Sequence, residues 1–281
     1  AGRGTGETES DTSDKGADEM TIKELTHKLE QKYPLEKAES WDNSGLQVGR
    51  KNKAVRKVLL ALDATDEVID EAVQWQADLL LTHHPLTLDG IRKVQAESLT
   101  GHKIFSLITH DICHYAMHTN YDVVERGGAA GELMKLRQPE VLEVTGTDSK
   151  TGEPEGIGRV GSLVRPVTVE ECAQIVKRIF ALDTVKIFGD LDQVIERVAI
   201  CPGSGKSMIG TAIRKKAQVM ITGDIGHHDG IDAVDQGIAV IDAGHYGLEH
   251  IFVERMAQYL KTQFPELEIK KTGSGNPFQV V

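Results

Sequence analysis

The sequence has few cysteines and no long apolar run, and each shortage excludes a class of protein. Cys113, Cys172 and Cys201 are odd in number, lie far apart and form no Cys-x-x-Cys pair. Neither a disulfide framework nor a zinc ribbon is therefore expected. No apolar run approaches the roughly 20 residues of a membrane-spanning helix, and no secretory signal is visible. We expect a soluble, cytoplasmic protein.

Basic residues are also in the minority. The chain holds 32 Lys and Arg against 43 Asp and Glu, a net charge of −11. This balance argues against broad contact with a phosphate backbone, so nucleic acid is not an expected partner. Residues 1–19 are rich in Gly, Ser, Thr and acids and have almost nothing to bury. We expect them to be a disordered tail or an added remnant before the natural-looking start at Met20.

Histidines, in contrast, are concentrated. Ten of the eleven fall in two windows, six between His83 and His118 and four between His227 and His250. Imidazole and carboxylate are ligands for zinc, iron or manganese, and four or five such groups exceed what one tetrahedral ion needs. The pattern predicts a dinuclear metal site. The residues at ligand spacing are His83, His84, His118 with Asp122, His228, and His245 with Glu249.

A histidine that stands alone is more often an ordinary hydrogen-bonding side chain than a ligand. We apply that interpretation to His27, His102, His110, His114 and His250.

The remaining histidines differ from these because they follow apolar runs that predict strands. Residues 77–82 lead into His83, residues 112–117 lead into His118, and residues 237–242 run toward His245. Open α/β sheets place their sites at the carboxyl ends of strands. Position as well as residue type therefore favours a metal site.

Two segments 140 residues apart follow the same plan. Residues 58–82 and 198–222 each read as strand, helix and strand, with Thr65 or Ser204 near the start of a capped helix. Parallel strands need such a helical crossover, so each segment predicts a βαβ unit. We expect two related α/β domains with mostly parallel sheets. One would comprise residues 20–125 with 240–281, and the other residues 126–239.

Local patterns predict further elements. Residues 156–164 and 186–189 read as strands, and Thr168 begins a helix with capping chemistry. The last helix is expected from Glu249 to Leu260, which would place the Glu249 carboxylate in its first turn. The apolar end of residues 276–281 predicts a final strand.

The stretch Cys201 to Ser207 ends in Gly-Lys-Ser but is not a P-loop. A P-loop needs a glycine five positions before Gly205, and Ile200 stands there. A glycine-rich turn between strand and helix can still bind an anion through its amides, so phosphate contact and a simple tight turn both stay open.

Six motifs stand out along the chain: Trp41 to Gly49, Leu81 to Leu86, His118 to Asp122, Gly156 to Arg159, Thr222 to Asp224 with His228, and Asp242 to Glu249. With these motifs in this order, the chain resembles the Nif-three-like family, also called GTP cyclohydrolase 1 type 2 homologues, from Met20 to Val281. The resemblance implies two α/β domains, a two-metal site and a toroidal hexamer.

The resemblance also implies roles for single residues. The metal ligands would be His83, His84, Asp122, His245 and Glu249. His118 and His228 would line the same pocket and transfer protons, because imidazole titrates near working pH.

The chain departs from the family at three positions. Gly226 and His227 replace the usual basic or aromatic residue before the histidine, and Leu248 replaces a threonine. The first change is expected to alter substrate contacts and the second a hydrogen bond near the metals, and neither removes a ligand.

Three functions follow from the resemblance. The first is GTP cyclohydrolase activity, in which hydroxide held by two divalent ions attacks the purine C8, and ring opening releases formate. The second is two-metal hydrolysis of another nucleotide or a phosphoester. The third is a metal-binding assembly or regulatory protein without turnover. Zinc, iron and manganese suit the ligands alike.

Overall fold

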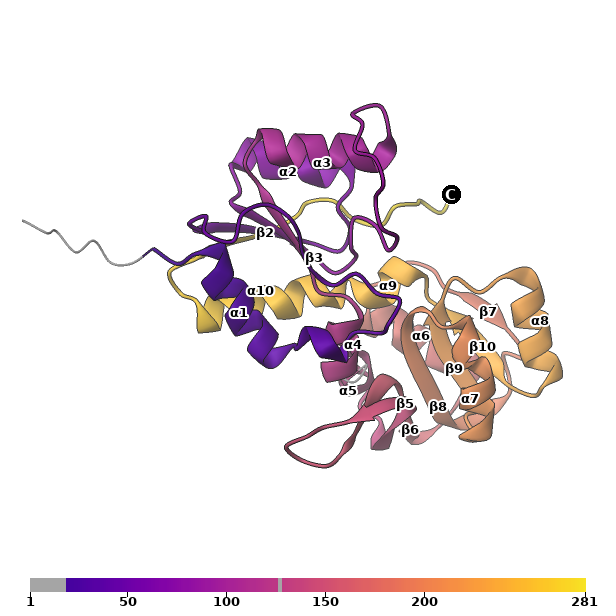
Figure 1. Cartoon of the computed structure of the whole chain (residues 1–281). Helices are drawn as coiled ribbons and strands as arrows, with labels where there is room; N and C mark the ends of the chain where they lie inside the picture. Colours follow the sequence, from indigo (N-terminus) through magenta and orange to yellow (C-terminus); the bar gives the residue numbers. More distant parts are fainter. Residues whose placement is uncertain (1–18, 126–127) are drawn as a thin grey trace, which may run out of the picture.

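Two β-sheets with helices on their faces form the framework of the protein (Figure 1). The computed structural model describes residues 19–125 and 128–281. The tail expected over residues 1–19 lies, apart from its last residue, outside the described residues. No described helix is both long enough and apolar enough to cross a bilayer.

The first sheet is mostly parallel. Its order is β1-β4-β3-β2-β11, in which β1 alone runs antiparallel to its neighbour. Its strands are β1 (Gly45–Val48), β2 (Lys57–Ala61), β3 (Leu79–Thr82), β4 (Cys113–Ala116) and β11 (Glu268–Lys271).

The second sheet is mixed. The strands are β5 (Arg137–Thr147), β6 (Pro154–Thr168), β7 (Lys186–Phe188), β8 (Val194–Ser204), β9 (Val219–Gly223) and β10 (Ala239–Asp242). In the order β5-β6-β8-β9-β10-β7, the strands β8, β9 and β10 are parallel and the other three pair antiparallel. The expected parallel arrangement therefore describes the centre of this sheet, while its edges are antiparallel.

Alternation along the central strands explains why helices cover both faces of the first sheet. Val58 and Leu60 of β2 face one layer of helices, and Leu59 and Ala61 face the other. The first layer is α1 (Ile22–Lys32) and α10 (Ile251–Gln263), and the second is α2 (Asp66–Trp75) and α3 (Leu99–Thr109). Figure 1 shows the sheet between these two layers.

The second sheet is covered in the same way. Residues of α6 (Val169–Ile179) pack on one face, and residues of α7 (Ile209–Arg214) and α8 (His227–Asp235) pack on the other. The short helical elements are η1 (Leu35–Lys37), α4 (Thr119–Val124), α5 (Gly128–Leu133), η2 (Lys206–Met208) and α9 (His245–Glu249).

Both predicted βαβ units are present. In the first, β2 and β3 are parallel and connected by α2, with Thr65 capping the helix through Val68 N. In the second, β8 and β9 are parallel and connected by η2 and α7. Ser204 is the last residue of β8, and no side chain caps η2, so the expected cap in the second unit is wrong. Thr168 does form a capping box with Glu171.

The C-terminal part of the chain differs from expectation in two respects. The last helix, α10, begins at Ile251, and Glu249 ends the short α9, so the expected first-turn position of its carboxylate is wrong. The last strand is β11, which pairs with β2, and residues 276–281 form no strand. β10 pairs within the second sheet, and β11 pairs within the first.

Candidate metal centre

The proposed ligands lie between the two domains, where several elements begin or end. His83 and His84 directly follow β3, and Asp122 lies in the short α4 that follows β4. His245 and Glu249 are the first and last residues of α9, four positions apart on one helix face. All five therefore reach one place although they are up to 166 positions apart in the chain.

Glu249 is the centre of the cluster. Its Oε2 atom lies 2.9 Å from Nε2 of His84 and 2.9 Å from Nε2 of His245, and these two nitrogens are 3.2 Å apart. Its Oε1 atom lies 3.9 Å from Nε2 of His83. The two carboxylate oxygens thus face different histidines, which is how a carboxylate bridges two ions.

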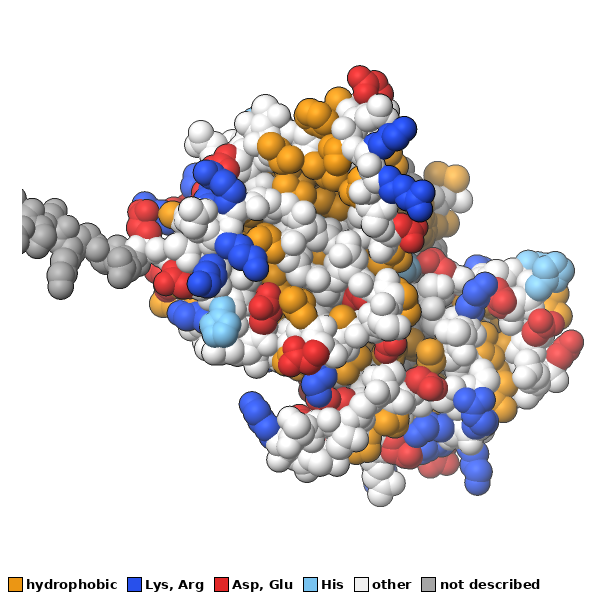
Figure 2. Space-filling view, in the orientation of Figure 1, with side chains coloured by type: hydrophobic (Ala, Val, Ile, Leu, Met, Phe, Trp, Pro, Cys, Tyr) orange, Lys and Arg blue, Asp and Glu red, His pale blue; other side chains and the backbone are white. Residues whose placement is uncertain are grey.

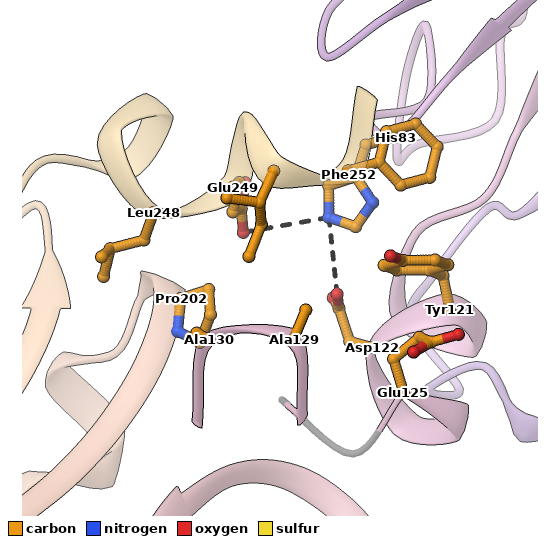
Figure 3. Close-up of a pocket in the computed structure, with 11 residues that line it drawn as sticks. His83, Tyr121, Asp122, Glu125, Ala129, Ala130, Pro202, Leu248, Glu249 and Phe252 are labelled. Atoms are coloured by element: carbon orange, nitrogen blue, oxygen red, sulfur yellow. Dashed lines mark ion pairs between the residues drawn. The ribbon is translucent and has the colours of Figure 1, made fainter. Parts of the chain in front are cut away.

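His83 is the centre of the second group of donors. Its Nε2 atom lies 3.6 Å from Oδ1 of Asp122 (Figure 3). Two groups of three residues each bring one donor atom per residue within 4.8 Å of one another. The first group is His83, His84 and His118, and the second is His84, His245 and Glu249. In the described chain His84 belongs to both groups. His118, which the resemblance placed only in the lining of the pocket, belongs to the first group.

Each histidine of the cluster is held by a hydrogen bond at Nδ1, which leaves Nε2 directed to the centre. Such partners orient metal-binding imidazoles. The partners are Met117 O for His83 at 2.7 Å, Asp63 for His84 at 2.7 Å, Asp42 for His118 at 2.8 Å and Asp224 for His245 at 2.8 Å.

Sequence reasoning missed the three aspartates among these partners. Asp63 follows β2, and Asp42 and Asp224 lie inside two of the motifs that carry the family resemblance. Asp63 and Asp224 follow the ends of β2 and β9 within two residues, and a position close after a strand is the same feature that marks His83 and His245.

The protonation properties of the cluster fit a site for cations. Burial opposes protonation of His84, but hydrogen bonds with Asp63 and Glu249 raise its pKa to about 10. The hydrogen bond with Glu249 likewise raises the pKa of His245 to about 9. Positive charge is therefore favoured around Glu249, and metal ions supply positive charge in place of these protons.

His83 and Asp122 provide the strongest test of whether these residues suit a metal ion. Burial lowers the pKa of His83 to about 3, so its imidazole is neutral, as a metal ligand must be. Its Nε2 is buried and has no hydrogen-bond partner in the described structure. Partial enclosure and the charge of Glu249 raise the pKa of Asp122 well above its ordinary value. A cation between these groups would satisfy the free nitrogen and relieve the repulsion between the carboxylates.

Two cavities adjoin the cluster. A small one of about 30 Å³ lies behind His83, Asp122 and Glu249, next to Tyr121 and Phe252 (Figure 3). The other, of about 650 Å³, is large enough for a small-molecule ligand and lies between the two domains. His84, His118, Asp122, His245 and Glu249 all line it.

The two predicted proton-transfer residues lie in different places. His118 lines the large cavity. His228 is exposed in the first turn of α8 beside His227, and it lines neither cavity. The structure therefore does not bring His228 to the cavities beside the other proposed site residues. The contact of Gly230 with the ring of Phe188 holds α8 against β7, outside the site.

The histidines expected to be ordinary side chains lie outside the cluster. His114 is buried and bonded to Thr82, and His27, His110 and His250 bond to neighbouring residues of their own helices. The glycine-rich turn is closer to the site than expected: Gly203, Ser204 and Ser207 line the large cavity.

Comparison with known sequences and structures places the chain among a group of related proteins. The profile of the family described as Duf34/NIF3 (NGG1p interacting factor 3) matches residues 20–277. A protein of Clostridium perfringens named GTP cyclohydrolase 1 type 2 homolog is 35% identical, over 86% of this chain and 92% of its own. A protein of the same name from Streptococcus pneumoniae is 37% identical, over 86% of this chain and 90% of its own.

Solved structures share the fold. A hypothetical protein of Staphylococcus aureus superposes with a TM-score of 0.84 at 29% identity, over 94% of this chain and 100% of its own. Reduced HcgD from Methanocaldococcus jannaschii superposes with a TM-score of 0.78 at 31% identity, over 91% of this chain and 98% of its own.

Proposed function

Because the chain belongs to the Duf34/NIF3 family, we propose that it is a hydrolase dependent on two divalent metal ions. The ligands would be His83, His84, Asp122, His245 and Glu249. The observation that carries the proposal is the position of Glu249, whose two oxygens face different histidines. A single ion would leave one side of this carboxylate, and the free Nε2 of His83, without a partner.

Zinc, iron and manganese all suit this mixture of imidazole and carboxylate ligands. When bound, two such ions lower the pKa of water and stabilise negative charge on the attacked group. The aspartates at the Nδ1 atoms would keep the imidazoles in the orientation and tautomer that ligation needs.

His118 is the residue proposed to transfer protons. Asp42 holds its Nδ1 at 2.8 Å, and the ring lines the large cavity, so Nε2 is the atom available to a substrate. A histidine fixed in this way can accept a proton from water and return it to a leaving nitrogen. His228 has no part in this step.

GTP is the first candidate substrate, as the name of the relatives suggests. In this reaction two water molecules are consumed, the bonds from the purine C8 to N7 and N9 break, and C8 leaves as formate. A cavity of about 650 Å³ is within the usual range for ligands of nucleotide size.

The test measures metal content and formate release on the same samples. Elemental analysis of the native protein should approach two metals per chain. Protein loaded separately with zinc, manganese or ferrous iron should release formate from GTP, and His118→Gln should slow release by about 10²-fold or more at unchanged metal content. Glu249→Gln, which removes a ligand, is the background control. Metal content near zero in native and metal-soaked protein would exclude the metal site. Formate release no greater than in Glu249→Gln would exclude GTP as substrate.

We also propose a cytoplasmic, closed homo-oligomer, with a hexamer as first candidate. Three unpaired cysteines suit a reducing compartment. Figure 2 shows hydrophobic side chains gathered over α3, where Leu99, Phe105 and Ile108 are exposed. Exposed apolar patches of this kind mark interaction surfaces, and closed symmetry is usual for homo-oligomers. Light scattering should give a multiple of the chain mass, and a monomer mass would contradict the proposal.

A further inference from the structure

One wall of the large cavity presents apolar side chains to solvent. Trp41 is 55% exposed and Leu88 is 50% exposed, although both line the cavity beside the metal centre. Leaving apolar side chains of this size in contact with water costs free energy, which their burial against a bound ligand would recover. At the edge of a site, such side chains mark the place where a ligand is bound.

The loop that carries Trp41 is firmly attached to the site. The carboxylate of Asp42 accepts hydrogen bonds from the amide and hydroxyl of Thr119, from the hydroxyl of Ser44 and from the amide of Asn43, and it also contacts Nδ1 of His118. These bonds keep the pKa of Asp42 below its ordinary value although its burial acts in the opposite direction. The loop is therefore fixed relative to His118, and Trp41 with it.

A second contact attaches this loop to the one that carries Leu88. The side-chain amide of Asn43 donates to the carbonyl oxygen of Thr87 at 2.8 Å. The wall thus consists of two connected loops of the first domain. A preformed wall of this kind binds a ligand with little loss of conformational entropy.

The half-exposed indole ring of Trp41 lies beside the ring of His118. The two ring centroids are 5.8 Å apart, and the interplanar angle is 76°. In this edge-to-face arrangement the two rings do not stack. A flat ring bound against Trp41 would therefore lie next to His118, the residue proposed to transfer protons.

The opposite wall has a different character. It comes from the second domain and includes Ser204 and Ser207 of the glycine-rich turn, with Met208 beside them. The cavity thus joins an aromatic wall, a metal centre and a hydroxyl-bearing wall. That combination suits a molecule with a flat apolar face and polar groups at its edges.

We propose that Trp41 is a specificity-determining residue that stacks on the planar heteroaromatic ring of the substrate, a nucleobase. The proposal rests on the hydrolase function proposed above, since the ring must be held where hydrolysis takes place. Stacking on an aromatic side chain is available to every base, because every base has a π face. Trp41 therefore selects for the presence of a ring, and the polar groups around it would select which ring.

The test is an equilibrium binding experiment on the full-length, metal-loaded protein, so that it does not depend on turnover. The probes are guanosine, GTP, inorganic triphosphate and ribose 5-phosphate. The chain has two tryptophans, and Trp75 lies in α2 beside Lys57, outside the cavity. In Trp75→Phe, fluorescence reports Trp41 alone, and we expect guanosine and GTP to quench it while triphosphate and ribose 5-phosphate do not.

Calorimetry on variants then measures the contribution of the ring. Trp41→Ala should weaken guanosine binding ten-fold or more, and Trp41→Phe, which keeps an aromatic face, by less than three-fold. Trp75→Phe is the matched control and should bind as wild type does. Metal content should be equal in all four proteins, which shows that the variants are folded around an intact centre.

Two results would overturn the proposal. One is guanosine affinity unchanged in Trp41→Ala, and the other is triphosphate binding as tightly as GTP, which would assign recognition to the phosphates. Binding that depends on Trp41 without any formate release would refute the GTP cyclohydrolase reaction and leave the stacking role intact. The two proposals can therefore fail separately.

Discussion

Gly203 lies directly against the carboxylate of Glu249. Its φ is +74°, and a Cβ atom at this position would be 2.5 Å from Oε1 of Glu249 and 3.7 Å from Nε2 of His245. Only glycine accepts both the left-handed backbone and the close approach. The glycine-rich turn from Cys201 to Ser207 therefore brings the backbone next to the proposed metal centre.

Substitution of Gly203 tests this relationship. Gly203→Ala should reduce metal affinity at least ten-fold, because the new methyl group displaces the Glu249 carboxylate. Gly152→Ala is a matched control, since Gly152 has a φ of +72° and open space around it. Both variants should lose roughly 1–2 kcal/mol of unfolding free energy from the left-handed conformation. Chelator competition measures affinity, urea unfolding measures stability, and equal metal affinity in the two variants would contradict the prediction.

The aspartates behind the histidines give a second prediction. Asp63→Asn keeps the size of the side chain but removes the charge that holds Nδ1 of His84 at 2.7 Å. Metal affinity should fall by about 10- to 100-fold, the usual effect of losing such a partner. Asp70→Asn, an exposed change on the neighbouring α2, should leave affinity as in wild type. A metal titration that gives the same curve for both variants would show that Asp63 has no orienting role.

A third prediction separates the metal centre from the fold. His245→Ala should lose metal yet stay folded, because the cores consist of apolar residues of the sheets and helices rather than of the ligands. Added zinc or manganese should raise the melting temperature of wild type, since a ligand stabilises the state it binds, and should not raise that of the variant. Circular dichroism at 222 nm checks the fold. An insoluble or unfolded variant would mean that the metals are structural.

The proximity of the proposed ligands was predictable because strand periodicity places the ends of β3 and β10 at one edge of each sheet. His83 and His245 follow those ends closely, and the short α9 then aligns Glu249 with His245. What sequence could not provide is the direction of side chains on loops between the domains. Asp42, Asp63 and Asp224 reach their histidines through tertiary contacts across 76, 21 and 21 positions of sequence.

The position of His228 and the form of the C-terminus both depend on tertiary contacts. Gly230 of α8 packs on the ring of Phe188 in β7, a contact that no local pattern reveals. The apolar end of residues 276–281 resembled a strand, but β11 already occupies the edge beside β2. Local sequence predicts an element, and competition for sheet edges decides whether it forms.

His114 gives a prediction for pH that is independent of the metals. The hydroxyl of Thr82 donates to the carbonyl oxygen of His84, so Nε2 of His114 is the donor to Thr82, and its buried Nδ1 is left without a partner in the described structure. Burial lowers the pKa of His114 to about 3 from an ordinary value of 6.5. The unfolded chain therefore binds a proton below pH 6.5 that the folded chain excludes, and stability falls as the pH falls from 6.5 toward 3.

The measurement compares urea unfolding at pH 7.5 and pH 5.5, with a chelator present so that metal release plays no part. Between these values the loss of unfolding free energy should be about 1.4 kcal/mol smaller in His114→Gln than in wild type, the contribution of one proton over one effective pH unit. His102→Gln, an exposed histidine on α3, is the matched control and should lose as much as wild type. An identical pH dependence in His114→Gln and His102→Gln would show that the folded protein accepts a proton at His114.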